Sequence, residues 1–269
     1  MNDQPPPGQS RPVPAEADFQ EIRSRLGRLE QELADLELEL VTRRSELVRF
    51  EAIYLTRIGT RIARLDGLRA KLAETRFRKS QSGGDRAAAE ATRRVARESQ
   101  GALGDLPEEV DEPDQSRFLP STELRQRYRE LARRIHPDLA STDEGSERRT
   151  VLMARLNEAY SQGDLVAMNG VALDAEQGLD EDLAAGTGLS YGELEKIESA
   201  ISAATKRVAQ VTHELEELNR SELAYMMRRV NEASGEGKDL LADMAAALDA
   251  EIAEAELRLT EETDVGPPP

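Results

Sequence analysis

The residues that could do chemistry are few, and they centre on one tripeptide, His136-Pro137-Asp138. An imidazole can accept or donate hydrogen bonds, a nearby carboxylate can accept them from a cation, and the proline between them restricts the backbone. The same residues have a simpler interpretation, in which the histidine caps carbonyls at a helix end and the proline only stops the helix. The flanking residues must decide between these two interpretations.

The tripeptide follows a segment with the pattern of an amphipathic helix. Ser121 is a favourable N-cap, while Pro120 before it and Pro137 after it limit the helix at both ends. A second helix is expected from about residue 147 to 161, beyond the polar loop 139–147, so that two antiparallel helices form a hairpin. The apolar stripes are Leu124, Tyr128, Leu131, Ala132 and Ile135 on the first helix, and Val151, Leu152, Leu156, Ala159 and Tyr160 on the second.

This hairpin resembles the J-domain of DnaJ-type co-chaperones. The second helix of that family usually reads Tyr-Arg-x-Leu-Ala-x-x-x-His-Pro-Asp, and residues 128–138 match this pattern. The family's third helix usually carries Ile-Asn-Glu-Ala-Tyr, which Leu156-Asn157-Glu158-Ala159-Tyr160 matches closely. A J-domain-like region is therefore expected over residues 117–168.

The resemblance implies an interaction and no catalysis by this chain. Such domains dock on a DnaK-type ATPase chaperone and stimulate its ATP hydrolysis, which traps a client polypeptide. A stripe of arginines would complement an acidic patch on the ATPase, and Asp138 would accept a charge-assisted hydrogen bond from an arginine of the partner. Pro137 would rigidify the loop and His136 would orient it. The residues expected at this contact are His136, Pro137, Asp138, Tyr128, Arg125, Arg129 and Arg133.

The chain departs from the family pattern at two places. In residues 111–121, where the family's first helix would lie, only Phe118 and Leu119 are apolar, and Arg127 stands where the family has a small alanine packed on that helix. Both departures indicate that the first helix is missing or is replaced, for instance by part of a coiled coil. Leu139 and Ala140 stand where basic residues often follow the tripeptide. With no zinc cysteines, the chain also lacks the family's zinc-binding client domain.

Heptad patterns flank the hairpin on both sides. In residues 16–79, apolar residues alternate at steps of three and four from Phe19 to Leu40, which predicts an N-terminal coiled coil. Steps of four at Ile58 and Ile62 mark a stutter, where the supercoil unwinds locally. These heptads either self-associate or fold back on the C-terminal heptads within one chain.

The C-terminal heptads occupy residues 189–263, interrupted by a turn at 234–239. They predict a helical hairpin or coiled coil in which two helices run antiparallel. The expected fold is thus all-α, with long coiled-coil helices flanking a short J-domain-like helical hairpin. The remaining segments are predicted to be a disordered tail at 1–15, a flexible linker at 80–116, an acidic linker at 169–188 and a tail at 264–269.

The composition excludes several classes of function. There are no cysteines and only two histidines, so disulfides, thiolate zinc sites, iron–sulfur clusters and multi-histidine metal sites are excluded or nearly so. His213 is interpreted as a structural residue of the C-terminal helix. Glycine clusters lack the preceding strand of a phosphate-binding loop. We therefore expect no catalytic residues, no metal, no cofactor and no enzyme activity.

The net charge and the hydropathy of the chain limit the classes of partner that it can bind. The net charge is −17 and the C-terminal part is strongly acidic, which disfavours nucleic acid and anionic lipid as partners. No apolar run is long enough to cross a bilayer and the N-terminus lacks a secretory pattern, so a cytoplasmic location is expected. The expected partners are a DnaK-type chaperone, a client protein and a second copy of the chain through the coiled coil.

Two other functions remain open from the residues. One is a coiled-coil scaffold with a degenerate J-like module and no chaperone partner, favoured by the missing first helix. The other is a helical hairpin that binds nucleic acid through its arginines, which the scarcity of aromatic residues and the acidic charge disfavour. Tyr128 and Tyr160 are predicted to be packing residues, although the Tyr128 hydroxyl can also reach solvent.

Overall fold

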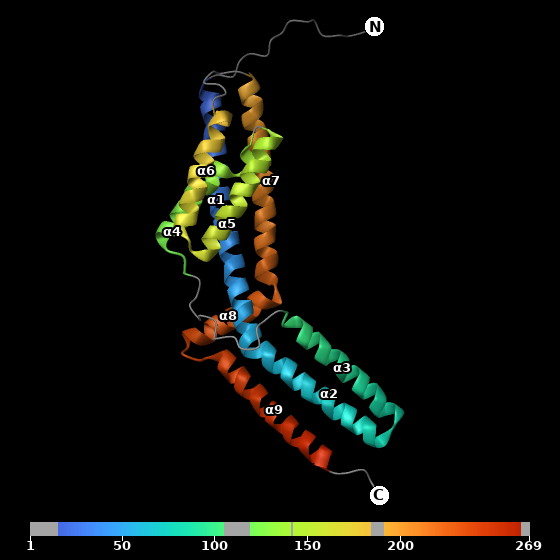
Figure 1. Cartoon of the computed structure of the whole chain (residues 1–269). Helices are drawn as coiled ribbons and strands as arrows, with labels where there is room; N and C mark the ends of the chain where they lie inside the picture. The colour runs from blue at the N-terminus through green and yellow to red at the C-terminus, as the bar shows by residue number, and fades with distance from the viewer. Residues whose placement is uncertain (1–15, 105–118, 141, 184–190, 265–269) are drawn as a thin grey trace, which may run out of the picture. The chain divides into compact units, whose positions relative to one another are not determined.

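The computed structural model describes residues 16–104, 119–140, 142–183 and 191–264, and the secondary structure in these ranges is entirely helical (Figure 1). This confirms the all-α prediction at the level of fold class. The chain divides into two units, each built from two separate stretches of sequence. The first comprises residues 1–45 and 119–219, and the second comprises residues 46–118 and 220–269.

The first unit is organised around two helices that run side by side in the same direction. They are the N-terminal part of α1 (Glu16–Tyr54) and α7 (Tyr191–Arg220). Leu33 and Leu40 of α1 pack with Val211 and Leu215 of α7 in one apolar cluster. Because the N-terminal heptads contact C-terminal heptads of the same chain, α1 follows the fold-back alternative within this unit.

Ion pairs flank this apolar seam at a constant spacing in sequence. They join Arg23 to Glu193, Glu37 to Arg207, and Arg44 to Glu214, so that each pair is separated by 170 residues. A constant separation requires that both helices run in the same direction and keep one register. The contacts therefore define the pairing of α1 with α7 over at least three helical turns.

The tripeptide is carried by three further helices of the first unit. They are α4 (Thr122–Ile135), α5 (Asp143–Gln162) and α6 (Leu165–Leu183), with the short 3₁₀ turn η2 (Pro137–Leu139) after α4. Ser121 caps α4 by accepting the Leu124 amide, as predicted, and the apolar stripe of α4 is buried. Helix α5 begins earlier than predicted, because the Thr142 hydroxyl caps it by accepting a hydrogen bond from the Gly145 amide.

Helix α6 corrects the prediction of an acidic linker at 169–188, since the chain is helical to Leu183. Gly163, with a φ of 73°, ends α5 and lets the chain turn directly into α6. Met168, Val171, Ala172 and Ala175 of α6 are buried. Their spacing is that of one helical face, and the acidic residues around them obscured it in the sequence. Residues 184–188 lie outside the described ranges.

The second unit begins with an irregular turn inside the long N-terminal helical region. The π-helix η1 (Leu55–Gly59) joins α1 to α2 (Thr60–Ser80). It lies at the predicted stutter, and Ile58 within it is buried. A π turn takes up one extra residue per turn, which accommodates a break in the heptad pattern without ending the helix.

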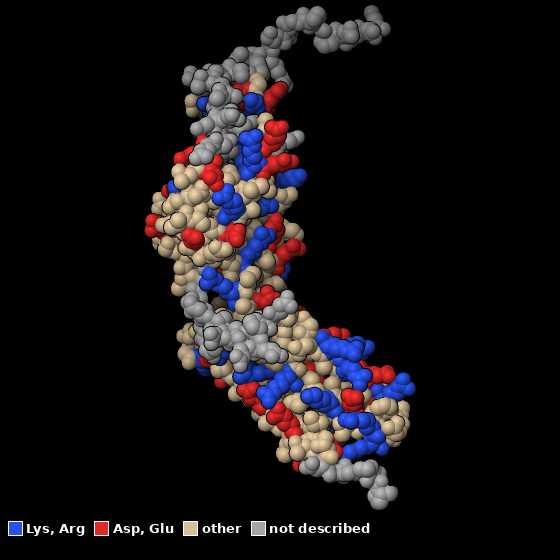
Figure 2. All heavy atoms as spheres, in the orientation of Figure 1, with Lys and Arg blue, Asp and Glu red and all other residues tan. Residues whose placement is uncertain are grey.

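Helix α2 pairs with α9 (Leu240–Asp264), again with both helices running in the same direction. Leu65 and Leu72 of α2 pack with Ile252 and Ala255 of α9. Arginines of η1 and α2 pair with acids of α9 and of the residue before it, and in Figure 2 basic and acidic side chains lie beside one another in this part of the surface. The acidic C-terminal charge is thus partly neutralised within the chain by the pairs Arg57–Asp239, Arg61–Asp249, Arg64–Glu256, Arg69–Glu251 and Arg76–Glu262.

The pairing of α9 with α2 shows that the predicted C-terminal hairpin over 189–263 is wrong. Helix α7 packs on α1 in the first unit, whereas α8 (Glu222–Gly235) and α9 belong to the second. The apolar stripes of α7 and α9 were correctly located. The periodicity of a sequence does not show which apolar stripes pack together. Here α7 packs on α1 and α9 packs on α2, and the two do not pack on each other as a hairpin.

Helix α3 (Gly83–Ala102) corrects the prediction of a flexible linker at 80–116. It packs on α2, where Ala89 is buried, and Ser99 donates a hydrogen bond to Asp66. The sequence favoured a linker because the apolar face of this segment is mostly alanine. Small side chains instead let two helix backbones approach closely. Residues 105–116 of the predicted linker lie outside the described ranges.

Both predicted tails also fall largely outside the described ranges. Residues 1–15 and 265–269 are not described, and Asp264 is the last residue of α9. Among the described residues, none of the helices is long and apolar enough to span a membrane.

We predict that Ala89→Leu lowers the thermal unfolding midpoint of the second unit, because the buried contact of α3 with α2 has no space for the larger side chain. The expected cost is about 1–3 kcal/mol. The matched control is Ala88→Leu on the exposed face of the same helix, which we expect to change stability by less than about 0.5 kcal/mol. Equal midpoints for the two variants, measured by calorimetry, would contradict the packed position of α3.

Candidate functional site

The His-Pro-Asp tripeptide forms a fixed turn at the end of α4. His136 leaves the helix with φ −63° and ψ 128°, and Pro137 then opens the 3₁₀ turn that Ala140 closes by donating to the Pro137 carbonyl. The His136 Nδ1 atom accepts a hydrogen bond from the Asp138 amide at 3.2 Å. The imidazole therefore holds the backbone of Asp138, which is the loop-orienting role that the sequence indicates.

The hydrogen bonds of His136 fix its tautomer. Because Nδ1 accepts the Asp138 amide, the ring proton of the neutral imidazole lies on Nε2. The Nε2 atom is 3.5 Å from Oε1 of Glu37 on α1, so it faces an acceptor. His136 is buried, with 3% of its surface exposed. The histidine thus joins the tripeptide to α1.

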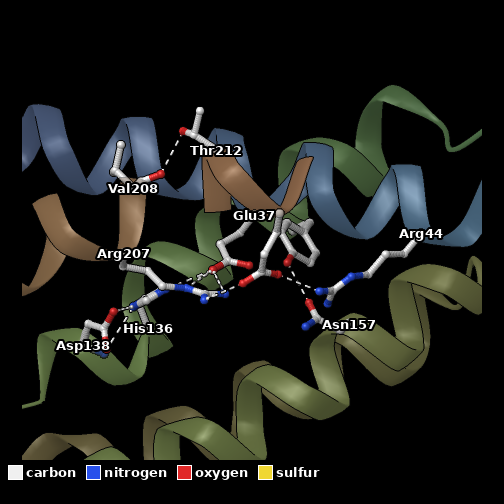
Figure 3. Close-up of polar contacts among 10 residues, drawn as sticks. Glu37, Arg44, His136, Asp138, Asn157, Arg207, Val208 and Thr212 are labelled. Atoms are coloured by element: carbon white, nitrogen blue, oxygen red, sulfur yellow. Dashed lines mark hydrogen bonds and ion pairs between the residues drawn. The ribbon is translucent and has the colours of Figure 1, made fainter. Parts of the chain in front are cut away.

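Glu37 is a buried carboxylate at the centre of these contacts (Figure 3), with 5% of its surface exposed. Arg207 of α7 approaches its Oε1 atom with Nε at 2.8 Å and a terminal nitrogen at 2.7 Å. The guanidinium supplies the positive charge that a carboxylate needs when it is removed from water. Three segments far apart in sequence therefore meet at one oxygen atom.

Further charges extend this cluster in alternating order. Arg207 also lies 3.3 Å from Glu214, and Glu214 accepts from Arg44 at 2.7 Å. Burial by itself lowers the pKa of Arg207, but Glu37, Glu214 and Asp138 together raise it above its usual value. The influence of Asp138 shows that the tripeptide's carboxylate lies within electrostatic reach of the Arg207 guanidinium.

The pKa of Glu37 reflects the same balance. Burial alone raises the pKa, while the hydrogen bond from His136 and the charge of Arg207 lower it. The lowering effects win, and the pKa of Glu37 is below its usual 4.5. The carboxylate is therefore ionised in the folded protein at neutral pH.

Arg149 of α5 supports the turn from its other side. It is buried, with 7% of its surface exposed, and a terminal nitrogen donates to the His136 carbonyl at 3.4 Å. This carbonyl is at the C-terminal end of α4, where backbone acceptors lack partners inside the helix. A cation at this end also interacts favourably with the helix dipole.

Two tyrosines join the two sequence motifs. The Tyr128 hydroxyl donates to Oδ1 of Asn157 at 2.7 Å, and its ring centroid lies 5.0 Å from that of Tyr160. Both rings are fully buried, as predicted for packing residues, but the Tyr128 hydroxyl does not reach solvent as the sequence suggested. Burial raises the pKa of Tyr128 well above its usual value. The Tyr160 hydroxyl lies 2.9 Å from the Thr42 hydroxyl of α1.

The predicted arginine stripe faces α1 within the same unit. Arg129 pairs with Asp35 at 2.6 Å, and Arg133 donates to Gln31 at 2.7 Å. A hydrogen bond from Arg125 lowers the pKa of the Tyr160 hydroxyl, although burial raises it more. The structure thus brings the seven predicted site residues together around α4, and α1 contacts three of them, Arg129, Arg133 and His136.

Helix α1 lies beside α4, as the contacts of Arg129 and Arg133 show. Arg127, which stands at the family's small alanine, does not pack there: its Nε donates to Asn169 of α6 at 3.0 Å. Among the described residues, part of the N-terminal helix lies beside the hairpin.

Sequence reasoning missed Glu37, Arg207 and Arg149. A signal existed for the first two, because Glu37 follows the seam residue Leu36 and Arg207 precedes Val208. Positions beside an apolar seam often form salt bridges between paired helices. The register of α1 against α7, which brings these two residues together, was not visible in the sequence. Arg149 lies in the polar start of α5 and carries no pattern of its own.

The chemical capacity of this arrangement is to hold and present a loop. Within the described ranges, no group of three or more His, Asp or Glu residues could hold a metal ion. The Glu37 carboxylate already accepts donors from two side chains and is buried, so it is not presented to a substrate. His213 is exposed on α7 next to Glu217, consistent with its structural interpretation.

Comparison with protein-family models, curated proteins and solved structures gave no match for this chain.

We predict that Glu37→Gln destabilises the first unit by about 3 kcal/mol, near the lower end for breaking a buried ion pair, because Arg207 keeps 27% exposure of its side chain. Gln keeps the shape but removes the charge that Arg207 requires. The matched control is Glu39→Gln, an exposed position on the same helix, which we expect to be nearly neutral. Denaturant unfolding of both variants measures the difference, and equal stabilities would show that the buried carboxylate contributes nothing.

The lowered pKa of Glu37 predicts how this difference changes with pH. A carboxylate whose pKa is lower when folded stabilises the protein above its unfolded pKa, and the stabilisation is lost as the pH falls through the folded value. The free energy separating wild type from Glu37→Gln should therefore be constant down to about pH 5 and shrink below the usual pKa of 4.5. A separation that persists unchanged at pH 3 would mean that Glu37 is not the titrating group.

Proposed function

We propose that this chain is a J-domain co-chaperone that docks on a DnaK-type ATPase chaperone through residues 136–138 and stimulates ATP hydrolysis. The observation that carries the proposal is the preformed turn, in which His136 holds the Asp138 amide while the Asp138 carboxylate stays 36% exposed. A loop fixed before binding loses little entropy when it meets a partner. The carboxylate is the group that would accept a hydrogen bond from an arginine of the ATPase.

The link between the two motifs also supports the proposal. The hydrogen bond from Tyr128 to Asn157 fixes α5 against α4, so the matching residues on both helices form one unit. Arg125, Arg129 and Arg133 share one face of α4, and the side chains of Arg129 and its partner Asp35 are still 41% and 50% exposed. In the proposed function these arginines complement an acidic surface of the chaperone and speed its encounter.

We further propose that α1 with α7, and α2 with α9, form parallel two-stranded coiled coils within the chain. The ion pairs beside each apolar seam support this, because flanking charges select the partner and the direction of such helices. In the proposed function these helices select a client or a location. The described seam residues Leu33 and Leu40 are used within the chain, so a homo-oligomer would need another surface.

A second candidate function is a scaffold in which the J-like module is only structural. It is favoured by the contacts that tie His136, Arg129 and Arg133 to α1 of the same chain. The two functions differ in one property: a scaffold binds its partners whether or not the Asp138 carboxylate is present.

The test is single-turnover ATP hydrolysis by the host's DnaK-type chaperone with and without this protein. We expect wild-type protein to accelerate hydrolysis and Asp138→Asn to lose that acceleration, since Asn keeps the backbone donor to His136 but removes the charged acceptor. Glu144→Gln, an exposed position beyond the same loop, should accelerate hydrolysis as wild type does. Equal acceleration by the Asp138→Asn variant would contradict docking through the tripeptide.

A further inference from the structure

The face of α4 that the proposed function assigns to a chaperone is contacted by α1. Asp35 pairs with Arg129, and Gln31 accepts from Arg133, so two residues one turn apart on α1 meet two arginines one turn apart on α4. The order is reversed, as it must be for two helices that run in opposite directions at this contact. Helix α1 therefore supplies the acceptors that an acidic patch of a partner would supply.

The tripeptide is engaged by the same two helices. Glu37 of α1 lies next to the His136 imidazole, and Arg207 of α7 is held by Glu37 within electrostatic reach of Asp138. Arg207 thus adds a positive charge close to the tripeptide, where the proposed function expects an arginine of the ATPase. One network contacts both the arginine stripe and the loop.

The strength of these contacts differs along the network. The Arg129–Asp35 pair is about half exposed on both sides and is of the kind that contributes little to stability. The Glu37 contacts are buried and bind α1 firmly to α7. The contacts that cover the stripe are therefore the ones that a competing surface displaces first, while α1 and α7 remain paired.

We propose that residues 31–37 of α1, with Arg207 of α7, act as a latch that occupies the docking surface and lowers the activity of the co-chaperone until α4 separates from α1. This inference rests on the proposed function. The hairpin keeps an apolar core of its own when the latch opens, because Tyr128 and Tyr160 pack with each other, and α6, with Met168 and Val171 buried, packs on α4 and α5.

The test compares two variants of the full chain, each with two added arginines, in the ATP hydrolysis assay. In the opened variant, Gln31→Arg with Asp35→Arg, two new cations face Arg133 and Arg129. In the matched control, Glu32→Arg with Glu39→Arg, the new cations lie on the exposed face of the same helix. We expect the opened variant to stimulate hydrolysis about 10-fold more than wild type and the control, and Asp138→Asn to abolish this gain.

A cross-link tests the closed state independently of how well the opened variant folds. The natural chain has no cysteine, and Glu30 of α1 and Arg134 of α4 line one surface depression. Glu30→Cys with Arg134→Cys, joined by a short bifunctional thiol reagent, should lose stimulation, while each single variant treated with the reagent should keep it.

The outcomes separate the latch from the function. Asp138-dependent stimulation that is equal in wild type, opened variant and cross-linked protein would overturn the latch and leave the proposed function standing. No stimulation by wild type, control or folded opened variant would overturn the proposed function, and the latch with it. Stimulation that rises on opening and falls on cross-linking supports both.

Discussion

The carboxylate of Glu37 is the constraint on which the first unit depends. An ionised group removed from water must be met by donors, and here the donors come from Arg207 of α7 and His136 at the end of α4. A shift of α7 along α1 would take Arg207 away from this charge, and a shift of α4 would remove the His136 contact. One side chain therefore contributes both to the register of the paired helices and to the position of the loop.

This constraint gives the tripeptide two roles that draw on different residues. His136 is buried and acts inward, since its ring joins Glu37 to the backbone of Asp138. Asp138 acts outward through a carboxylate that stays partly exposed. A substitution at His136 disturbs both the buried contacts and the position of the loop, whereas one at Asp138 changes only the exposed carboxylate of the loop. For this reason a substitution at Asp138 tests the proposed function, and one at Glu37 tests stability.

The sequence predicted what depends on local patterns. Helix α4, with its cap at Ser121 and its stop at Pro137, was predicted from short-range signals, and the π turn η1 lies at the break in the heptads. Helices α3 and α6 were assigned to linkers. For residues 85–99 a short helix was possible, but its apolar face is mostly alanine, and acidic residues obscured the buried face of α6. Glu37 and Arg207 were missed because their meeting depends on a register between distant segments, which no local pattern encodes.

The constant separation of the ion pairs between α1 and α7 has a consequence for biosynthesis. Glu37 leaves the ribosome 170 residues before Arg207, which at about 5–20 residues per second amounts to roughly 10–35 seconds. During this interval the seam of α1 and its buried acid have no partner, while the antiparallel pair α2 and α3 is already complete. The nascent chain thus passes through a stage in which the apolar seam of its earliest helix is exposed, and that seam is then a segment in need of a chaperone.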